Sequence, residues 1–306
     1  MVFKISKINK SDFIFDSFIN FFMVIMLIVT AYPLYFTIIA SLSEPADVAR
    51  GNVRLWVVNL TFQSYQQVFA HSQIWVGYMN TVYYTLFGTL FSLLITIPAA
   101  YTLSKKQLPG RGWLTMFILF TMYFSGGMIP TYLLIRNLGL LNTRYVLILT
   151  GGFSVYNMVI TRVFFMSSIP EEIFESARMD GASDFRQFFS IAIPLAVPVI
   201  AVITLFYSVA NWNAYFNALL YITRRDLEPL QLVLRRVLIM SETALDEAVL
   251  QGTLEPGQLI DAVQRAYAAY TMKYAVVFIA SLPLLIMYHF IQKYFVKGIM
   301  IGSLKG

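Results

Sequence analysis

Between two long apolar stretches the chain reads Pro170-Glu-Glu-Ile-Phe-Glu-Ser-Ala-Arg-Met-Asp-Gly-Ala182. Pro170 suits the first position of a helix, and Ser167 or Ser168 before it is expected to cap that helix. The two glutamates then fall in the first turn, where the helix dipole favours negative charge. Gly181 suits the position that follows a helix end, and a serine two residues later can cap the next helix. The stretch therefore predicts two short helices joined by a bend, which either lie in water or, as their pattern favours, dock on a partner.

The composition of the whole chain is that of a membrane protein. Hydrophobic residues make up 58% of the 306 residues and charged residues 12%, against about 25% charged in a soluble domain. The net charge of +6 comes from basic residues beside apolar stretches, so nucleic-acid binding is not expected. The chain has no cysteine and lacks the G-x-x-x-x-G-K-S/T loop that cradles phosphates. We therefore expect no catalysis, no metal and no bound cofactor on this chain.

Six stretches are long and apolar enough to cross a membrane, which takes about 20 residues. Helices are expected in all of them, because only a helix satisfies every backbone group within one segment. The prediction is an all-α integral membrane protein that forms a single transmembrane domain over residues 1–306. The spans are expected at 18–42, 78–103, 113–135, 145–166, 191–221 and 274–295.

The lysines indicate how the spans are oriented. With both termini in the cytoplasm, eight of the nine lysines lie on the inner side, as the positive-inside rule favours. Several arginines fall outside, mostly in a long loop that counts less in this rule. The charged stretch at 170–190 and the tail at 297–306 are then cytoplasmic, and the loops at 43–76 and 223–272 face outward. These outer loops either connect spans or receive an external partner.

A spaced motif within the charged stretch resembles a family signature. Glu175-Ser-Ala177, three residues, Gly181, nine residues, Ile191, one residue and Ile193-Pro194 resemble the EAA signature of bacterial ABC importer permeases. Every spacing is kept, and the departures are a serine for the middle alanine and an isoleucine for the leucine. Other stretches resemble the LplC/YtcP-like carbohydrate permeases, which are related to the second maltose-permease subunit; they lie at 124–143, 206–217 and 294–306.

This resemblance implies a fold, a location and partners. The fold would be the type I ABC importer permease fold, with six transmembrane helices and cytoplasmic coupling helices between spans four and five. The chain would lie in the cytoplasmic membrane of a bacterium and pair with a second homologous permease. Two copies of an ABC ATPase would carry ATP and Mg, and an extracellular or periplasmic sugar-binding protein would deliver an oligosaccharide. The chain itself would be non-catalytic and work by alternating access.

In such a transporter the charged stretch would contact the ATPase. Ala177 and Ala182 allow close approach, and Phe185 can fill a pocket. Glu175 can pair with a basic residue, and Asp180 is placed to stabilise the turn or to cap the next helix. The alternative is an ordinary amphipathic helix in a cytoplasmic loop. The expected coupling residues are Glu172, Glu175, Ala177, Asp180, Gly181, Ala182, Phe185 and Pro194.

Polar residues within the predicted spans indicate where a substrate would pass. Such residues are costly in lipid and usually face a neighbouring helix or water. Amides can bind sugar hydroxyls, and aromatic rings can stack on pyranose rings. The alternative is hydrogen bonding between packed helices or to the sister subunit. The candidate lining residues are Asn211, Trp212, Asn213, Tyr215, Asn217, Tyr123, Ser125, Tyr156 and Asn157.

The sequence leaves other functions open. The outer-loop arginines make an acidic, uronate-containing oligosaccharide one option, and an ABC permease for a non-sugar solute such as a peptide or polyamine is another. A secondary transporter or channel would carry charged residues inside its spans. The predicted spans hold almost none apart from Arg162, which disfavours that class.

Overall fold

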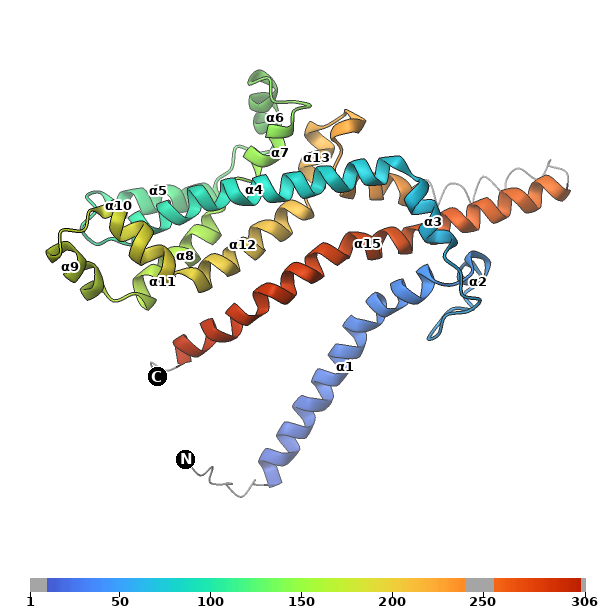
Figure 1. Ribbon diagram of the computed structural model, residues 1–306, viewed down its shortest axis with the longest axis horizontal. Helices are drawn as coiled ribbons and strands as arrows, with labels where there is room; N and C mark the ends of the chain where they lie inside the picture. The colour runs from blue at the N-terminus through green and yellow to red at the C-terminus, as the bar shows by residue number, and fades with distance from the viewer. Residues whose placement is uncertain (1–9, 240–255, 304–306) are drawn as a thin grey trace. The chain divides into compact units, whose positions relative to one another are not determined.

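The computed structural model describes residues 10–239 and 256–303, and every regular element in that part of the chain is a helix (Figure 1). The prediction of an all-α protein is confirmed. Within the described residues, three helices are long and apolar enough to cross a membrane, over residues 14–41, 72–104 and 266–294, and three bent helix pairs would bring the number to six. The chain divides into two compact units, residues 1–70 with 237–279 and residues 71–236 with 280–306.

The first unit contains α1 (Lys10–Ser41), α2 (Pro45–Ala49), α3 (Gln63–Ala70) and the first half of α15 (Pro256–Ser303). The apolar side chains along α1 are mostly exposed, as expected of a helix that faces lipid or another subunit. The end of α1 is packed, with Ile39 in a small core where Phe36 meets Tyr274 edge to face at a ring distance of 5.7 Å.

The loop between α1 and α3 is held by hydrogen bonds. Asp47 accepts from the side-chain amides of Asn52 at 2.9 Å and Asn59 at 2.7 Å, and these bonds hold the pKa of its carboxyl below the usual value. The side chain of Trp56 in the same loop is exposed. The predicted outer loop at 43–76 therefore contains two short helices and an ordered connection between them.

The second unit is built around α4 (Ser72–Ser104), which packs against α7 (Arg144–Thr150), α8 (Val155–Ser168) and α12 (Val197–Trp212). Many of the buried residues of α4 are small or hydroxylated, which lets neighbouring helices approach closely in a membrane. A Cβ added at Gly88 would lie 2.9 Å from Nδ2 of Asn211 on α12. One added at Gly151 would lie 3.0 Å from Oδ1 of the same side chain.

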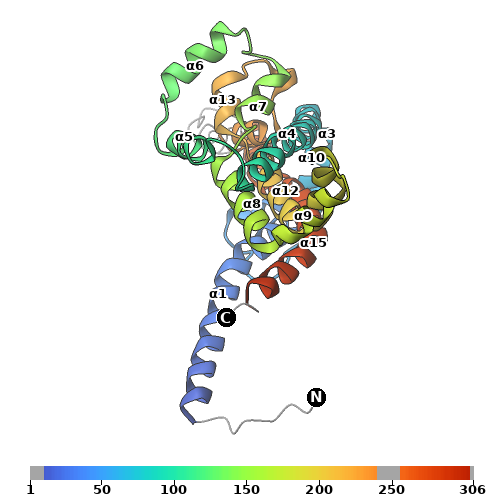
Figure 2. The same ribbon diagram turned by 90° about the vertical axis from the view of Figure 1, so that its left-hand side faces the viewer.

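Two of the predicted spans are interrupted at glycine pairs. α5 (Arg111–Tyr123) and α6 (Met128–Asn137) meet at 107°, and Figure 2 shows α6 turning away from α5. The break contains Gly127 with a φ of +83°, which a residue with a Cβ rarely adopts. α7 and α8 meet at 51° across Gly151 and Gly152. The segments expected as spans at 113–135 and 145–166 are therefore two helices each.

The helices in the regions of the expected fifth and sixth spans have bounds different from those predicted for the spans. Residues Asp184–Leu195 meet α12 at 79°. They comprise α10 (Asp184–Gln187), a π-helical turn (Phe188–Ala192) and α11 (Ile193–Leu195). The α12 helix ends at Trp212, before α13 (Phe216–Tyr221).

The last helix is much longer than the predicted sixth span. No glycine or proline stands between Gly257 and Pro283, so nothing local ends α15 before the membrane segment begins. The end of the predicted outer loop, at 256–272, and most of the predicted tail, at 297–303, are consequently helical. The tail residues 304–306 lie outside the described part of the chain.

Candidate functional site

The charged stretch folds as α9 (Glu171–Met179), a bend and α10, as the sequence predicts. Pro170 is the N-cap residue of α9 rather than its first helical residue. Ser167 and Ser168 form the end of α8, so the prediction of a serine cap is wrong. Glu171 and Glu172 lie in the first turn of α9, where the helix dipole stabilises their charges.

The end of α9 has the two hydrogen bonds of a Schellman motif. Gly181 has a φ of +78°, and its N–H donates to the carbonyl of Arg178 at 3.0 Å. The N–H of Ala182 donates to the carbonyl of Ala177 at 2.9 Å. The glycine conformation thus closes the helix, as the sequence predicts.

The following helix, α10, is capped by a serine. The Oγ of Ser183 accepts a hydrogen bond from the N–H of Arg186 at 3.4 Å. Of the two roles expected for Asp180, capping this helix is wrong, because Ser183 occupies the cap position. Asp180 is the C-cap residue of α9, and its N–H donates to the carbonyl of Ser176 at 3.0 Å.

Phe174 anchors α9 to the helix bundle. It is only 4% exposed and packs in a core with Tyr101 of α4 and Phe165 of α8. The Nζ of Lys105, directly after α4, lies 3.1 Å from the centroid of the Phe174 ring and 4.8 Å from that of Tyr101. Burial lowers the pKa of Lys105, although the nearby Glu171 carboxylate opposes that shift. A cation–π contact therefore joins α9 to the end of α4.

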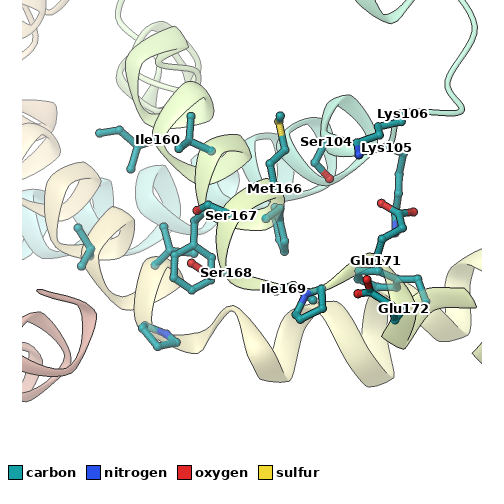
Figure 3. Close-up of a pocket in the computed structure, with 18 of the residues that line it drawn as sticks. Ser104, Lys105, Lys106, Ile160, Met166, Ser167, Ser168, Ile169, Glu171 and Glu172 are labelled. Atoms are coloured by element: carbon teal, nitrogen blue, oxygen red, sulfur yellow. The ribbon is translucent and has the colours of Figure 1, made fainter. Parts of the chain in front are cut away.

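A cavity of about 1040 Å³ lies beside this anchor (Figure 3). The ends of α4 and α8 line it, together with the starts of α9 and α12. Figure 3 shows Lys105 and Lys106 near Glu171 and Glu172 at one end of the cavity. Both the first turn of α9 and Phe174 thus border the cavity, and Phe174 also packs in the core.

Exposed apolar side chains lie along the rest of the segment. Met179 is 89% exposed, Phe185 79% and Phe189 60%. The sequence prediction included Phe185 but missed Met179 and Phe189. Their position as apolar residues within a charged stretch could have indicated that they are exposed. The other predicted coupling residues are exposed (Glu172, Glu175, Asp180, Gly181 and Pro194) or half-buried (Ala177 and Ala182).

Two predicted path residues are buried and hydrogen-bonded within the second unit. The Nδ2 of Asn211 donates to Oγ1 of Thr89 at 3.3 Å, and the Nε1 of Trp212 donates to the carbonyl of Ala280 at 3.0 Å. Asn157 on α8 is buried as well. The bonds of Asn211 and Trp212 are of the kind that the alternative interpretation expects, between packed helices.

Two other predicted residues, Asn213 and Tyr215, belong to a polar cluster that follows α12. The Nε2 of Gln231 donates to Oδ1 of Asn213 at 3.4 Å, and the guanidinium carbon of Arg235 lies 5.3 Å from the ring centroid of Tyr215. We name these four residues the Arg235 cluster. The predicted lining residues included neither Gln231 nor Arg235, although Arg235 is one of the outer-loop arginines and a spacing of four places both residues on one face of the helix at 230–239. The remaining candidates are exposed or half-buried outside this cluster: Asn217, Tyr123, Ser125 and Tyr156.

Comparison with known proteins covers almost the whole chain. The family described as binding-protein-dependent transport system inner membrane component matches residues 5–301. The chain belongs to this family. The permease is 39% identical to protein LplC of Bacillus subtilis over 91% of its own length and 90% of that protein. It is 35% identical to the polygalacturonan/rhamnogalacturonan transport system permease protein YtcP of Bacillus subtilis, over 96% and 99% of the two chains.

A solved structure shares the fold of the permease. It is the crystal structure of a bacterial ABC transporter involved in the import of the acidic polysaccharide alginate. One of its chains is 32% identical to the permease with a TM-score of 0.82, over 95% of the permease and 99% of that chain. The predicted resemblance to ABC importer permeases of the carbohydrate type is confirmed.

These matches define what the chain is. The permease is a non-catalytic, multi-pass inner-membrane subunit of an ABC importer, a system that implies an ATPase partner. Within residues 10–239 and 256–303, no group of three or more His, Cys, Asp or Glu side chains is placed to hold a metal ion.

Proposed function

We propose that the permease imports an oligosaccharide by alternating access, and that an ABC ATPase drives it through the segment 170–190. ATP and Mg would bind to two ATPase copies, a second homologous permease would complete the path, and a sugar-binding protein would deliver the substrate from outside. Both termini would then be cytoplasmic. The observation that carries the proposal is the state of α9, which Phe174 fixes to the bundle while Met179 and Phe185 stay exposed.

A helix held in this way is suited to receive a force from a partner. Burying an exposed Met or Phe side chain in a partner groove stabilises the contact by about 1.5–3 kcal/mol each. The Schellman hydrogen bonds at Gly181 keep the helix end closed, so the contact is not lost by fraying. Glu172 and Glu175 are exposed and can pair with basic residues beside such a groove.

Single cysteines test both the contact and the orientation, because the chain contains no cysteine of its own. Met179→Cys and Trp56→Cys, a matched control 77% exposed in the predicted outer loop, are placed in the complete transporter in cells. We expect Met179→Cys to crosslink to the ATPase and to resist a membrane-impermeant maleimide added outside. Trp56→Cys is expected to show the reverse. Labelling of position 179 from outside, or no crosslink there, would contradict the proposal.

Transport itself gives a second test of the segment. We expect Glu175→Lys and Gly181→Pro to abolish uptake while the protein still reaches the membrane, since one reverses a charge and the other distorts the closed helix end. Gln107→Lys is the control, because it alters an exposed residue in another predicted cytoplasmic loop. Normal uptake in both segment variants would count heavily against the coupling role.

We further propose that the imported oligosaccharide is acidic. The Arg235 cluster combines an aromatic ring, two amides and a cation, which suit a sugar ring, its hydroxyls and a carboxylate. The names of two similar proteins support this class: YtcP is a polygalacturonan/rhamnogalacturonan permease, and the solved structure belongs to an importer of acidic alginate. A neutral oligosaccharide is the second candidate, in which Tyr215 and Asn213 would act without Arg235.

The two candidates are separated by uronate trisaccharides and their uncharged methyl esters. We expect Arg235→Gln to reduce uptake of the acids about 10-fold or more, because a hydrogen bond to a charged group contributes about 1.5–3 kcal/mol. Uptake of the methyl esters should change little, and Arg235→Lys should retain part of the acid uptake. Arg54→Gln, which removes an exposed arginine outside the cluster, is the control. An equal loss for acids and esters would contradict the acidic substrate.

A further inference from the structure

The backbone between α9 and α12 is poorly suited to pass on a rigid movement. It contains a π-helical turn at Phe188–Ala192, then Pro194, then a 79° bend before α12. Irregular turns and prolines are the places where helices bend. These irregular turns allow the backbone to bend between α9 and α12 when α9 is displaced.

Side-chain contacts offer a second route, from α9 to α4. The Phe174 ring lies 5.9 Å from the Tyr101 ring, and the Nζ of Lys105 lies 3.1 Å from the centroid of the Phe174 ring. Phe174 is buried and Lys105 is half-buried, and a cation–π contact becomes stronger as it loses water. Because the cavity borders the first turn of α9, this contact is a joint rather than a broad helix–helix interface.

The α4 helix runs unbroken from this joint across the second unit, with Pro98 inside it (Figure 1). Toward its other end, its side chains bind the backbone of residues 226–230 through four hydrogen bonds of 2.7 to 3.1 Å. The side chains are those of Asn80, Thr81 and Tyr84. At the rise of an α-helix, the joint and this bonded segment are about 35 Å apart.

We propose that α4 carries the movement of α9 to residues 226–230, with Lys105 and Phe174 as the joint. This inference rests on the proposed contact between the segment 170–190 and the ATPase. Lys105 is a positioning residue, since it acts through Phe174 and not on nucleotide or sugar. Because residues 226–230 lead directly into the helix with Gln231 and Arg235, the Arg235 cluster changes position with the nucleotide state of the ATPase.

The test follows a reporter beside residues 226–230. Arg225→Cys is labelled with a maleimide in the complete transporter, purified with its partner subunits, with and without ATP and vanadate. We expect the nucleotide to change the labelling rate in the parent. In Lys105→Met this nucleotide-dependent change in labelling rate should be roughly five-fold smaller. A partly desolvated cation–π contact shifts a two-state equilibrium by about this factor. Lys105→Arg should keep the response, and so should Lys106→Met, which removes the exposed neighbouring charge.

Phe174→Leu repeats the test without altering charge, because it removes the ring and keeps apolar bulk. A full nucleotide response in both Lys105→Met and Phe174→Leu would overturn the inference, as would the absence of any response in the parent. Loss of the ATPase from the purified Lys105→Met complex would also overturn it, because Lys105 would then serve docking. The proposed function fails separately, if Met179→Cys in the parent does not crosslink to the ATPase.

Discussion

The substitution Gly181→Ala isolates the cost of one backbone angle at the end of α9. Gly181 has a φ of +78°, and a Cβ added there would meet no heavy atom of the described residues within 4 Å. Steric contact with these neighbours therefore adds nothing to the free-energy cost of the substitution. The left-handed conformation itself costs a residue with a Cβ about 1–2 kcal/mol. In Gly181→Ala, that free energy raises the fraction of molecules in which the end of α9 is open roughly 5- to 30-fold.

Amide hydrogen exchange at Ala182 measures this opening, because its N–H donates to the carbonyl of Ala177 in the closed end. Gly112→Ala is the matched control, since its added Cβ also meets no atom within 4 Å in the described part of the chain and its φ lies outside the left-handed range. We expect the control to leave exchange at Ala182 unchanged, and Gly181→Asn to give an intermediate rate, because Asn tolerates this conformation better. The same exchange rate in Gly181→Ala and the parent would refute the reasoning.

Three further predictions concern stability. In Gly152→Ala the new Cβ would lie 2.5 Å from Cε1 of Phe91, so we expect the free energy of unfolding to fall by about 1–3 kcal/mol, measured as a lower Tm. A Phe91→Leu background should relieve this loss, and no relief would argue against overpacking. Tyr207→Phe removes a hydroxyl that lies 2.7 Å from Oγ1 of Thr96 and accepts a hydrogen bond from the N–H of Ser154 at 3.1 Å, and it should cost about 1–3 kcal/mol in the same assay. Because the pKa of Asp47 is lowered in the folded loop, its carboxylate stabilises the loop at pH values above the ordinary aspartate pKa of about 3.9. This stabilisation is lost as the pH falls through the lowered pKa. Exchange protection of residues 44–60 should therefore hold down to about pH 4 and fall below it, and an Asp47→Ala variant with the same profile would contradict this.

The charged stretch could be predicted from the sequence because its signals are local. Two glutamates in the first turn, a glycine after the last turn and a serine before the next helix each act within a few residues. The position of Pro170 was off by one residue, and the serine cap was wrong because α8 continues through Ser168. Glycine pairs stand at the two breaks between α5 and α6 and between α7 and α8, but the angles of 107° and 51° depend on packing between distant segments.

The joint between Lys105 and Phe174 could not be predicted, because these residues are far apart in the chain and meet only after α4 and α9 pack. The polar residues after position 210 show a different limit. Asn211 is buried against α4, whereas Asn213, the residue directly after α12, is exposed. The sequence shows that these residues are polar, but the end and the packing of α12 decide which of them are bonded within the subunit and which are available to a substrate.

The fit of Asn211 against Gly88 and Gly151 has a consequence for directed evolution of this permease. One amide fills the space left by two missing side chains, so positions 88, 151 and 211 cannot tolerate change independently. In a combinatorial library, an enlarged residue at 88 should survive selection mainly in clones where position 211 has become smaller. Sequencing the survivors would then reveal the close contact between α4 and α12 as correlated substitutions at these positions.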